Sequence, residues 1–95
     1  MQYTIVREMS LTYDDFFRLL PGALKGSSYR IENNVVYINL DTGYLKISLS
    51  PQSQRAVGSL LLPMIQVTFE FDDCPENDRK LFFENFDLAY QKGGG

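Results

Sequence analysis

The feature of this sequence that most constrains its fold is a change of hydrophobic period near residue 28. From residue 28 to residue 49 apolar and polar residues alternate, which is the pattern of strands with one buried face. Two turn sequences interrupt the alternation, Asn33-Asn34 and Asp41-Thr42-Gly43. Asparagine and glycine tolerate the positive φ angles of tight turns. The sequence therefore predicts three strands joined by two hairpins.

With these turns in place, the two faces of the predicted sheet differ in chemistry. One face collects Tyr29, Ile31, Val36, Ile38, Leu40, Leu45, Ile47 and Leu49. The other collects Arg30, Glu32, Tyr37, Asn39, Tyr44, Lys46 and Ser48. Because removal from water favours apolar side chains, we expect the first face to be covered and the second to be solvated.

Further strands are indicated on both sides of this meander. Residues 3–9 alternate imperfectly and predict a first strand, and residues 65–71 alternate clearly and predict the last one. Residues 54–61 are weakly patterned and contain Gly58, which suggests a strand with a bulge or a close backbone approach at that glycine. Pro63 predicts a tight connection between these two segments, with one long bent strand as the alternative.

Two segments have helical periodicity. Thr12, followed by Asp14 and Asp15, forms a helix start, and Pro21-Gly22 is expected to end or bend the helix. Its apolar stripe is Tyr13, Phe16, Phe17 and Leu20. Pro75 fits the first turn of a second helix, which Lys92 and Gly93 would close. Its stripe is Phe82, Phe86, Ala89 and Tyr90, with Phe83 on the flank.

These elements predict one α+β domain over residues 1–92, followed by a flexible glycine tail over residues 93–95. Its architecture would be an antiparallel sheet of five or six strands with both helices packed on one face, in the order β-α-β-β-β-β(-β)-α. This order resembles the TBP-like fold, in which a curved antiparallel sheet is backed by helices. The stretch from Arg55 to Phe71 and the ending Phe86–Gly95 resemble small bacterial proteins, a likeness that implies no activity.

Composition excludes several classes of function. Nine basic residues against twelve acidic ones give a formal net charge of -3, which argues against nucleic acid as a partner. No histidine is present, which excludes histidine catalysis and histidine-ligated metal on this chain. Cys74 is the single cysteine, so the chain has neither an internal disulfide nor a multi-cysteine metal site. We predict no cofactor and no metal, and the inventory favours a non-enzymatic protein.

The same inventory bears on localisation. The N-terminal residues contain Arg7 and Glu8 and lack the apolar stretch of a secretory signal. The longest apolar run, residues 60–65, is far shorter than the ~20 residues that span a bilayer. With the cysteine content, these features predict a cytoplasmic protein without a membrane partner.

The candidate binding residues are Arg30, Tyr37, Tyr44, Lys46 and Arg55, which we expect on the outward sheet face. Aromatic area with a polar handle beside long basic side chains suits a peptide segment or a planar acidic ligand. The alternative is a plain solvated sheet face, because tyrosine is common in strands and Glu32 or Glu70 can neutralise the cations.

Three other features are better explained by structure than by function. The acidic residues Glu70, Asp72, Asp73, Glu76 and Asp78 lack calcium-loop spacing, and two of them suit a helix start. Cys74 has acidic neighbours and no histidine base, so we expect a passive thiol. The terminal Gly93-Gly94-Gly95 is similar to the tails of ubiquitin-like modifiers and sulfur carriers, although helix capping explains it more simply.

Two hypotheses of function follow. The first is a protein-interaction module that binds an unknown protein, or a second copy of itself, through the open sheet face or an edge strand. The alternative is a small-molecule site, enzymatic or not, between the helices and the sheet or at a dimer seam, in which Arg30 and Arg55 hold an acid group and Tyr13 or Tyr90 anchors it. A diglycine-tailed carrier is the remaining alternative.

Overall fold

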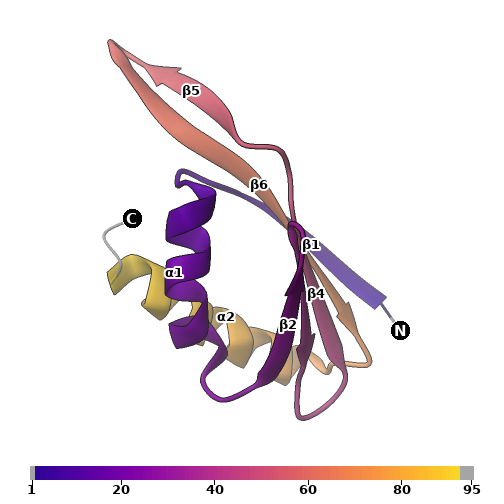
Figure 1. Ribbon diagram of the computed structural model, residues 1–95. Helices are drawn as coiled ribbons and strands as arrows, with labels where there is room; N and C mark the ends of the chain where they lie inside the picture. The colour runs from indigo at the N-terminus through magenta and orange to yellow at the C-terminus, as the bar shows by residue number, and fades with distance from the viewer. Residues whose placement is uncertain (1, 93–95) are drawn as a thin grey trace.

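The computed structural model describes residues 2–92, which form six strands and two helices (Figure 1). The elements are β1 (Gln2–Met9), α1 (Tyr13–Leu24), β2 (Ser28–Glu32), β3 (Val35–Asn39), β4 (Tyr44–Leu49), β5 (Ser53–Val57), β6 (Leu60–Asp72) and α2 (Glu76–Lys92). The predicted α+β class is confirmed. The predicted helix end at Gly93 and the glycine tail lie outside the described residues.

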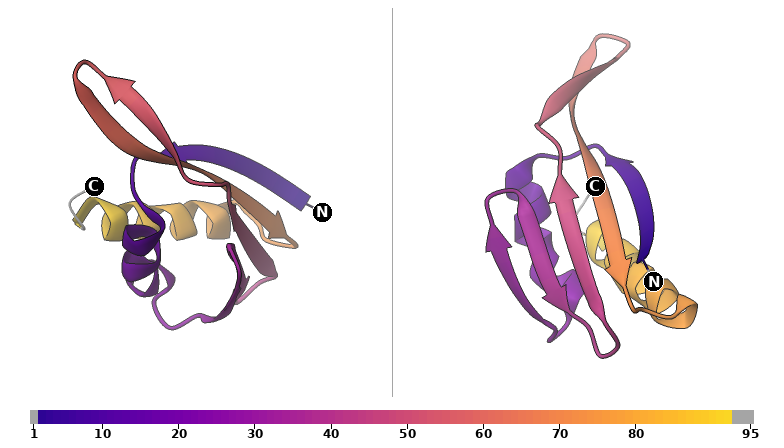
Figure 2. Two further views of the ribbon diagram at one scale, coloured as in Figure 1. Left: turned by 45° about the horizontal axis from the view of Figure 1, so that its top comes forward. Right: turned by 90° about the vertical axis from the view of Figure 1, so that its right-hand side faces the viewer.

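The six strands form one antiparallel sheet in the order β1-β6-β4-β3-β2. Strand β5 lies off this path and pairs with the first part of β6, where Ser53 is opposite Met64 and Val57 is opposite Leu60. The sheet is curved, and both helices lie on its concave side (Figures 1 and 2). The first and last strands of the chain, β1 and β6, are neighbours over eight register pairs from Gln2↔Asp72 to Met9↔Ile65.

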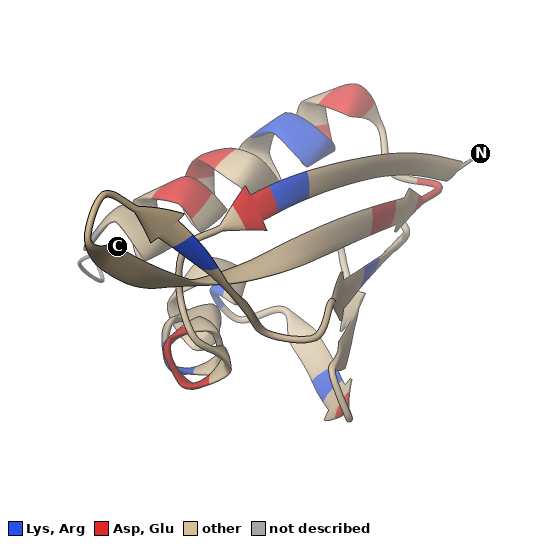
Figure 3. Cartoon of the chain, turned by 90° about the horizontal axis from the view of Figure 1, so that it is seen from above, with Lys and Arg blue, Asp and Glu red and all other residues tan. Residues whose placement is uncertain are grey.

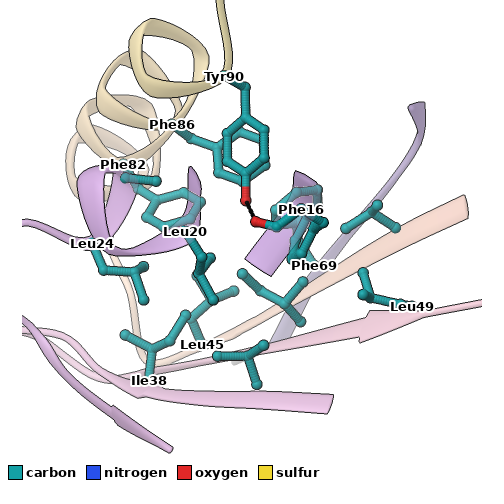
Figure 4. Close-up of a cluster of buried hydrophobic side chains, with 14 of the residues drawn as sticks. Phe16, Leu20, Leu24, Ile38, Leu45, Leu49, Phe69, Phe82, Phe86 and Tyr90 are labelled. Atoms are coloured by element: carbon teal, nitrogen blue, oxygen red, sulfur yellow. Dashed lines mark hydrogen bonds between the residues drawn. The ribbon is translucent and has the colours of Figure 1, made fainter. Parts of the chain in front are cut away.

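The core lies between the helices and the concave face (Figure 4). The predicted inward residues Ile38, Ile47 and Val67 are at most 2% exposed. The largest fully buried side chains of this core are phenylalanines. The ring of Phe69 in β6 lies 5.0–6.1 Å from three rings of α2, those of Phe82, Phe83 and Phe86. Edge-to-face pairs at such distances add to the free energy gained from burial alone.

The beginning of α1 follows the prediction, but its end does not. The Thr12 hydroxyl accepts a hydrogen bond from the Asp15 amide at 3.2 Å, so it caps the helix. The helix then continues through Pro21 to Leu24. Proline removes one helical hydrogen bond, but continuing the helix buries Ala23 and Leu24, whose contacts offset that cost.

Both predicted turns of the meander are confirmed. Asn33 has a φ of 57° and Gly43 a φ of 96°, each in the left-handed region. Gly43 is also required sterically, because a Cβ at this position would lie 2.1 Å from the Asp72 carbonyl oxygen. This turn therefore packs directly on the end of β6.

The structure corrects the prediction for residues 54–61. Gly58, with a φ of 61°, is not in a bulge but in the turn between β5 and β6. Pro63 does not form a tight connection, because β6 runs unbroken through it. The alternative of one long bent strand holds only from Leu60 onward, since the chain reverses between β5 and β6. Pro63 lies opposite Gln54, and its carbonyl accepts a hydrogen bond from the Ser10 hydroxyl on the side away from β5. The N–H and C=O groups of one strand residue point to the same side, so the N–H that Pro63 lacks would also have pointed away from β5. The proline therefore removes no hydrogen bond between β5 and β6.

The structure also corrects the coverage of the apolar face. Tyr29 and Ile31 in β2 have the predicted inward parity but are 38% and 47% exposed. Strand β2 is the last strand of the sheet, and the helices do not bury it as they bury β3 and β4.

Within residues 2–92 neither helix is long and apolar enough to cross a bilayer.

Candidate functional site

The outward face of the sheet brings four of the five predicted binding residues together. The register places Arg30, Tyr37, Lys46 and Glu70 side by side in one row across β2, β3, β4 and β6. Tyr44 occupies the next row, between Asn39 and Asp72. This juxtaposition follows from the period-2 alternation and the two hairpin turns, which fix the register.

Arg30 is held in place by two neighbours on this face. Its guanidinium carbon lies 4.4 Å from the centre of the Tyr37 ring, and its Nε donates to a Glu32 carboxylate oxygen at 2.7 Å. The Arg30 and Glu32 side chains are 66% and 56% exposed, so water screens the ion pair and it contributes little to stability. The pair nevertheless reduces the net positive charge that Arg30 presents to an acidic ligand.

These residues border a shallow hollow of about 320 Å³. Its walls include Arg30, Lys46, Tyr37 and Tyr44, and also the carboxylates of Glu70 and Asp72. The two cations come from β2 and β4 and the two carboxylates from β6, so the hollow as a whole does not concentrate positive charge. A mixed surface of this kind suits a polypeptide better than a small acid.

Arg55 does not join this group. It lies in β5 opposite Leu62, on the hairpin that projects from the body of the protein (Figures 1 and 2). The sequence prediction placed it on the sheet face because residues 54–61 were interpreted as one strand, with a bulge or a close backbone approach at Gly58. As a consequence, Arg30 and Arg55 do not share the hollow that Arg30 lines.

The projecting hairpin is the feature that sequence reasoning missed. We call β5 and the first part of β6, residues 53–64, the arm. Every residue from 51 to 61 is exposed, and Val57, Leu60 and Leu61 are 50%, 63% and 65% exposed. The signal was present in the sequence, because Gly58-Ser59 between two strand-forming segments is a typical two-residue hairpin turn.

The arm is apolar on both faces and almost uncharged. The register puts Val57, Leu60 and Leu62 on one face and Ala56 and Leu61 on the other. Arg55 is the one charged residue between Lys46 and Glu70, and the arm accordingly shows little colour in Figure 3. A two-stranded ribbon is marginally stable in water, and exposed apolar patches typically mark contact surfaces.

The tyrosines proposed as ligand anchors have structural partners. The Tyr90 hydroxyl donates to the Phe16 carbonyl at 2.7 Å, and burial raises the pKa of Tyr90 well above its usual range. The Tyr13 hydroxyl donates to the Ser50 carbonyl at 2.5 Å. Both hydroxyls join segments that are distant in sequence, α1 to α2 and α1 to the end of β4.

The thiol and the acidic residues have local environments of their own. Cys74 is buried, and burial, with the nearby Asp78 carboxylate, raises the pKa of its thiol. Asp78 accepts a hydrogen bond from the Thr42 hydroxyl, while Glu70 and Asp72 lie on the sheet face. Among residues 2–92 no three potential metal-binding side chains form a group. The predicted carrier tail, residues 93–95, lies outside the described residues.

Comparison of the chain with protein-family models, with curated proteins and with solved structures gave no match. The resemblance to the TBP-like fold therefore stays a prediction of topology.

Proposed function

We propose that this chain is a protein-interaction module that works in the cytoplasm and binds another polypeptide through the arm. The observation that carries the proposal is the exposure of apolar side chains on both faces of the arm, at Val57, Leu60 and Leu61. A folded domain gains nothing from leaving such side chains in water, so a partner that covers them would stabilise the arm.

The geometry of the arm fits a partner that adds a strand. Strand β5 pairs with β6 on one side, and its other side is an edge in the described sheet. An extended segment pairing there would bond to the backbone and cover the apolar side chains. Arg55 would favour a carboxylate in the partner segment.

The small-molecule alternative receives less support from the same structure. The hollow on the sheet face contains Glu70 and Asp72 beside its cations, and Arg30 is already paired with Glu32. Arg55, which was expected to complete the acid-binding group, lies on the arm. The sheet face therefore remains a second surface for a polypeptide rather than a site for an acid.

The proposal can be tested by affinity capture from the native cytoplasm, with quantitative mass spectrometry of bound proteins. The arm variant Leu60→Gln/Leu61→Gln should lose at least one partner that the unmodified chain retains. The matched control is Leu81→Gln/Leu88→Gln in α2, because these leucines are 56% and 51% exposed. If both variants recover the same proteins as the unmodified chain, the arm is not a binding element and the proposal is wrong.

A further inference from the structure

A second surface with an unused edge lies on the other side of the molecule, at β2. This strand ends the sheet order, and no strand in the described part of the chain pairs with its outer side. Figure 2 shows β2 as the outermost strand of the main sheet. It contains no proline and no glycine, so all of its N–H groups are intact.

The hydrogen bonds of β3 show which residues of β2 face this open edge. The Leu49 amide donates to the Asn34 carbonyl and the Leu40 amide donates to the Gly43 carbonyl, so the even-numbered residues of β3 bond toward β4. The odd-numbered residues of β3 therefore bond toward β2, and their register partners there are Ser28, Arg30 and Glu32. The N–H and C=O groups of Tyr29 and Ile31 consequently point to the open edge.

The same two residues also have uncovered side chains. Tyr29 and Ile31 are 38% and 47% exposed, although they continue the row of buried residues on the concave face. A strand added at this edge would satisfy the backbone groups of Ile31 and extend the apolar face at the same time. At the opposite edge, α2 already contacts β1, where Arg79 lies on the Tyr3 ring and Arg7 lies on the Phe83 ring.

The charges that flank Ile31 identify the partner strand. Arg30 precedes Ile31 and Glu32 follows it, and both lie on the outward face. In an antiparallel pair centred on Ile31, Arg30 of one strand lies opposite residue 32 of the other. A second copy of β2 supplies glutamate at that position, and the match occurs twice because the pairing is two-fold symmetric.

We propose that β2 pairs antiparallel with β2 of a second copy of this chain, with Ile31 at the two-fold axis. The two Ile31 residues exchange a pair of backbone hydrogen bonds, and their side chains meet on the concave side. Two cross-strand contacts between Arg30 and Glu32 flank them on the outward side. The sheet then continues through both copies, and the two-fold axis relates the two arms. This dimer uses none of the arm residues, so it stands independently of the proposed function.

The first test is the molar mass of the full chain by light scattering over a dilution series. The unmodified chain should show twice the monomer mass at high concentration. Arg30→Glu puts two glutamates opposite each other at both contacts and should halve that mass, as should Glu32→Arg. The double variant Arg30→Glu/Glu32→Arg restores opposite charges and should restore the dimer. The matched control Arg18→Glu breaks an exposed ion pair with Asp15 on α1 and should leave the mass unchanged.

The second test reads the backbone directly by amide hydrogen exchange. In the dimer the Ile31 amide is bonded across the two-fold axis, so it should be protected and should lose protection on dilution. The Arg30 amide bonds to β3 in either state and serves as the internal control. A monomeric mass at every concentration, or an Ile31 amide that exchanges as fast as one in an open loop, would overturn the proposal. Neither reading depends on arm partners, so the two proposals fail separately.

Discussion

The hydrogen bond between Tyr90 and the Phe16 carbonyl gives a prediction whose sign depends on pH. The Tyr90 side chain is 6% exposed, stacks on Phe86 at 4.3 Å between ring centres, and joins α2 to α1. The variant Tyr90→Phe keeps the ring and removes the hydroxyl. Near neutral pH it should lower the free energy of unfolding by about 1 kcal/mol, the net value of one buried hydrogen bond. For a domain of this size that corresponds to a fall of roughly 4–8 °C in the thermal midpoint.

The difference in stability between the unmodified protein and Tyr90→Phe should disappear in alkaline solution. Because burial raises the pKa of Tyr90 in the folded state, the unfolded chain loses this proton first, near its ordinary pKa of about 10. The contribution of Tyr90 to the free energy of unfolding is therefore fully present below about pH 10. Above that pH it falls by about 1.4 kcal/mol per pH unit. Tyr90→Phe has no such loss, so its deficit should shrink above about pH 10 and be cancelled near pH 11.

The assay is denaturant unfolding of both proteins at a series of pH values, followed by far-ultraviolet circular dichroism. The quantity of interest is the difference between the two unfolding free energies, since ionisation of the other tyrosines affects both proteins. Two parallel stability curves up to about pH 11 would refute the reasoning, because they would mean that Tyr90 ionises equally easily in the folded and unfolded states.

Three further predictions concern stability and reactivity. Gly43→Ala should lower the free energy of unfolding by about 3 kcal/mol, because the new Cβ would meet the Asp72 carbonyl. In Gly58→Ala the new Cβ meets no atom within 4 Å, so the loss should be about 1 kcal/mol, and thermal melts of both variants check this difference. Cys74 should react with a thiol reagent much more slowly in the native protein than in denaturant, and equal rates would show that burial does not protect it. Arg7→Ala should lower the free energy of unfolding by about 1 kcal/mol, because it removes the packing of Arg7 on the Phe83 ring. Asp87→Asn should lower it by less than about 0.5 kcal/mol, because the ion pair between Arg7 and Asp87 is exposed. An equal loss in both variants would assign the effect to charge.

The parts of the fold that could be predicted are those in which local chemistry and burial agree. Asn33 and Gly43 adopt positive φ angles at the two turns, and the alternation beside these turns places Ile38 and Ile47 in the core. The apolar stripes of the two helices could be predicted for the same reason. Phe16 in α1 and Phe86 in α2 belong to apolar residues at helical spacing, and both are completely buried.

The failures come from positions where the rest of the fold decides the outcome. Pro21 lies inside α1 because the following residues find a place in the core, which no local rule reveals. Tyr29 and Ile31 alternate like core residues, but their strand lies at the sheet edge. Strand order is set by pairing between residues far apart in the sequence, and local patterns of hydrophobicity do not reveal it.

In the candidate site, too, some residues could be placed from local patterns and one could not. Arg30, Tyr37, Tyr44 and Lys46 could be grouped correctly on one face because two hairpins with fixed turns set their register. Arg55 could not, since its position depends on whether Gly58 is a bulge or a turn. One glycine thus determines whether the segment joins the sheet face or forms a separate arm.

The pairing of β1 with β6 also determines the order in which the chain can fold during synthesis. The nearest register pair joins Met9 to Ile65 and the farthest joins Gln2 to Asp72, so the first strand must wait for most of the chain to leave the ribosome. The β2–β3–β4 meander involves only short loops and can form much earlier. Closure of the core then depends on the late arrival of β6, and premature termination before it would leave a meander with its apolar face open to aggregation.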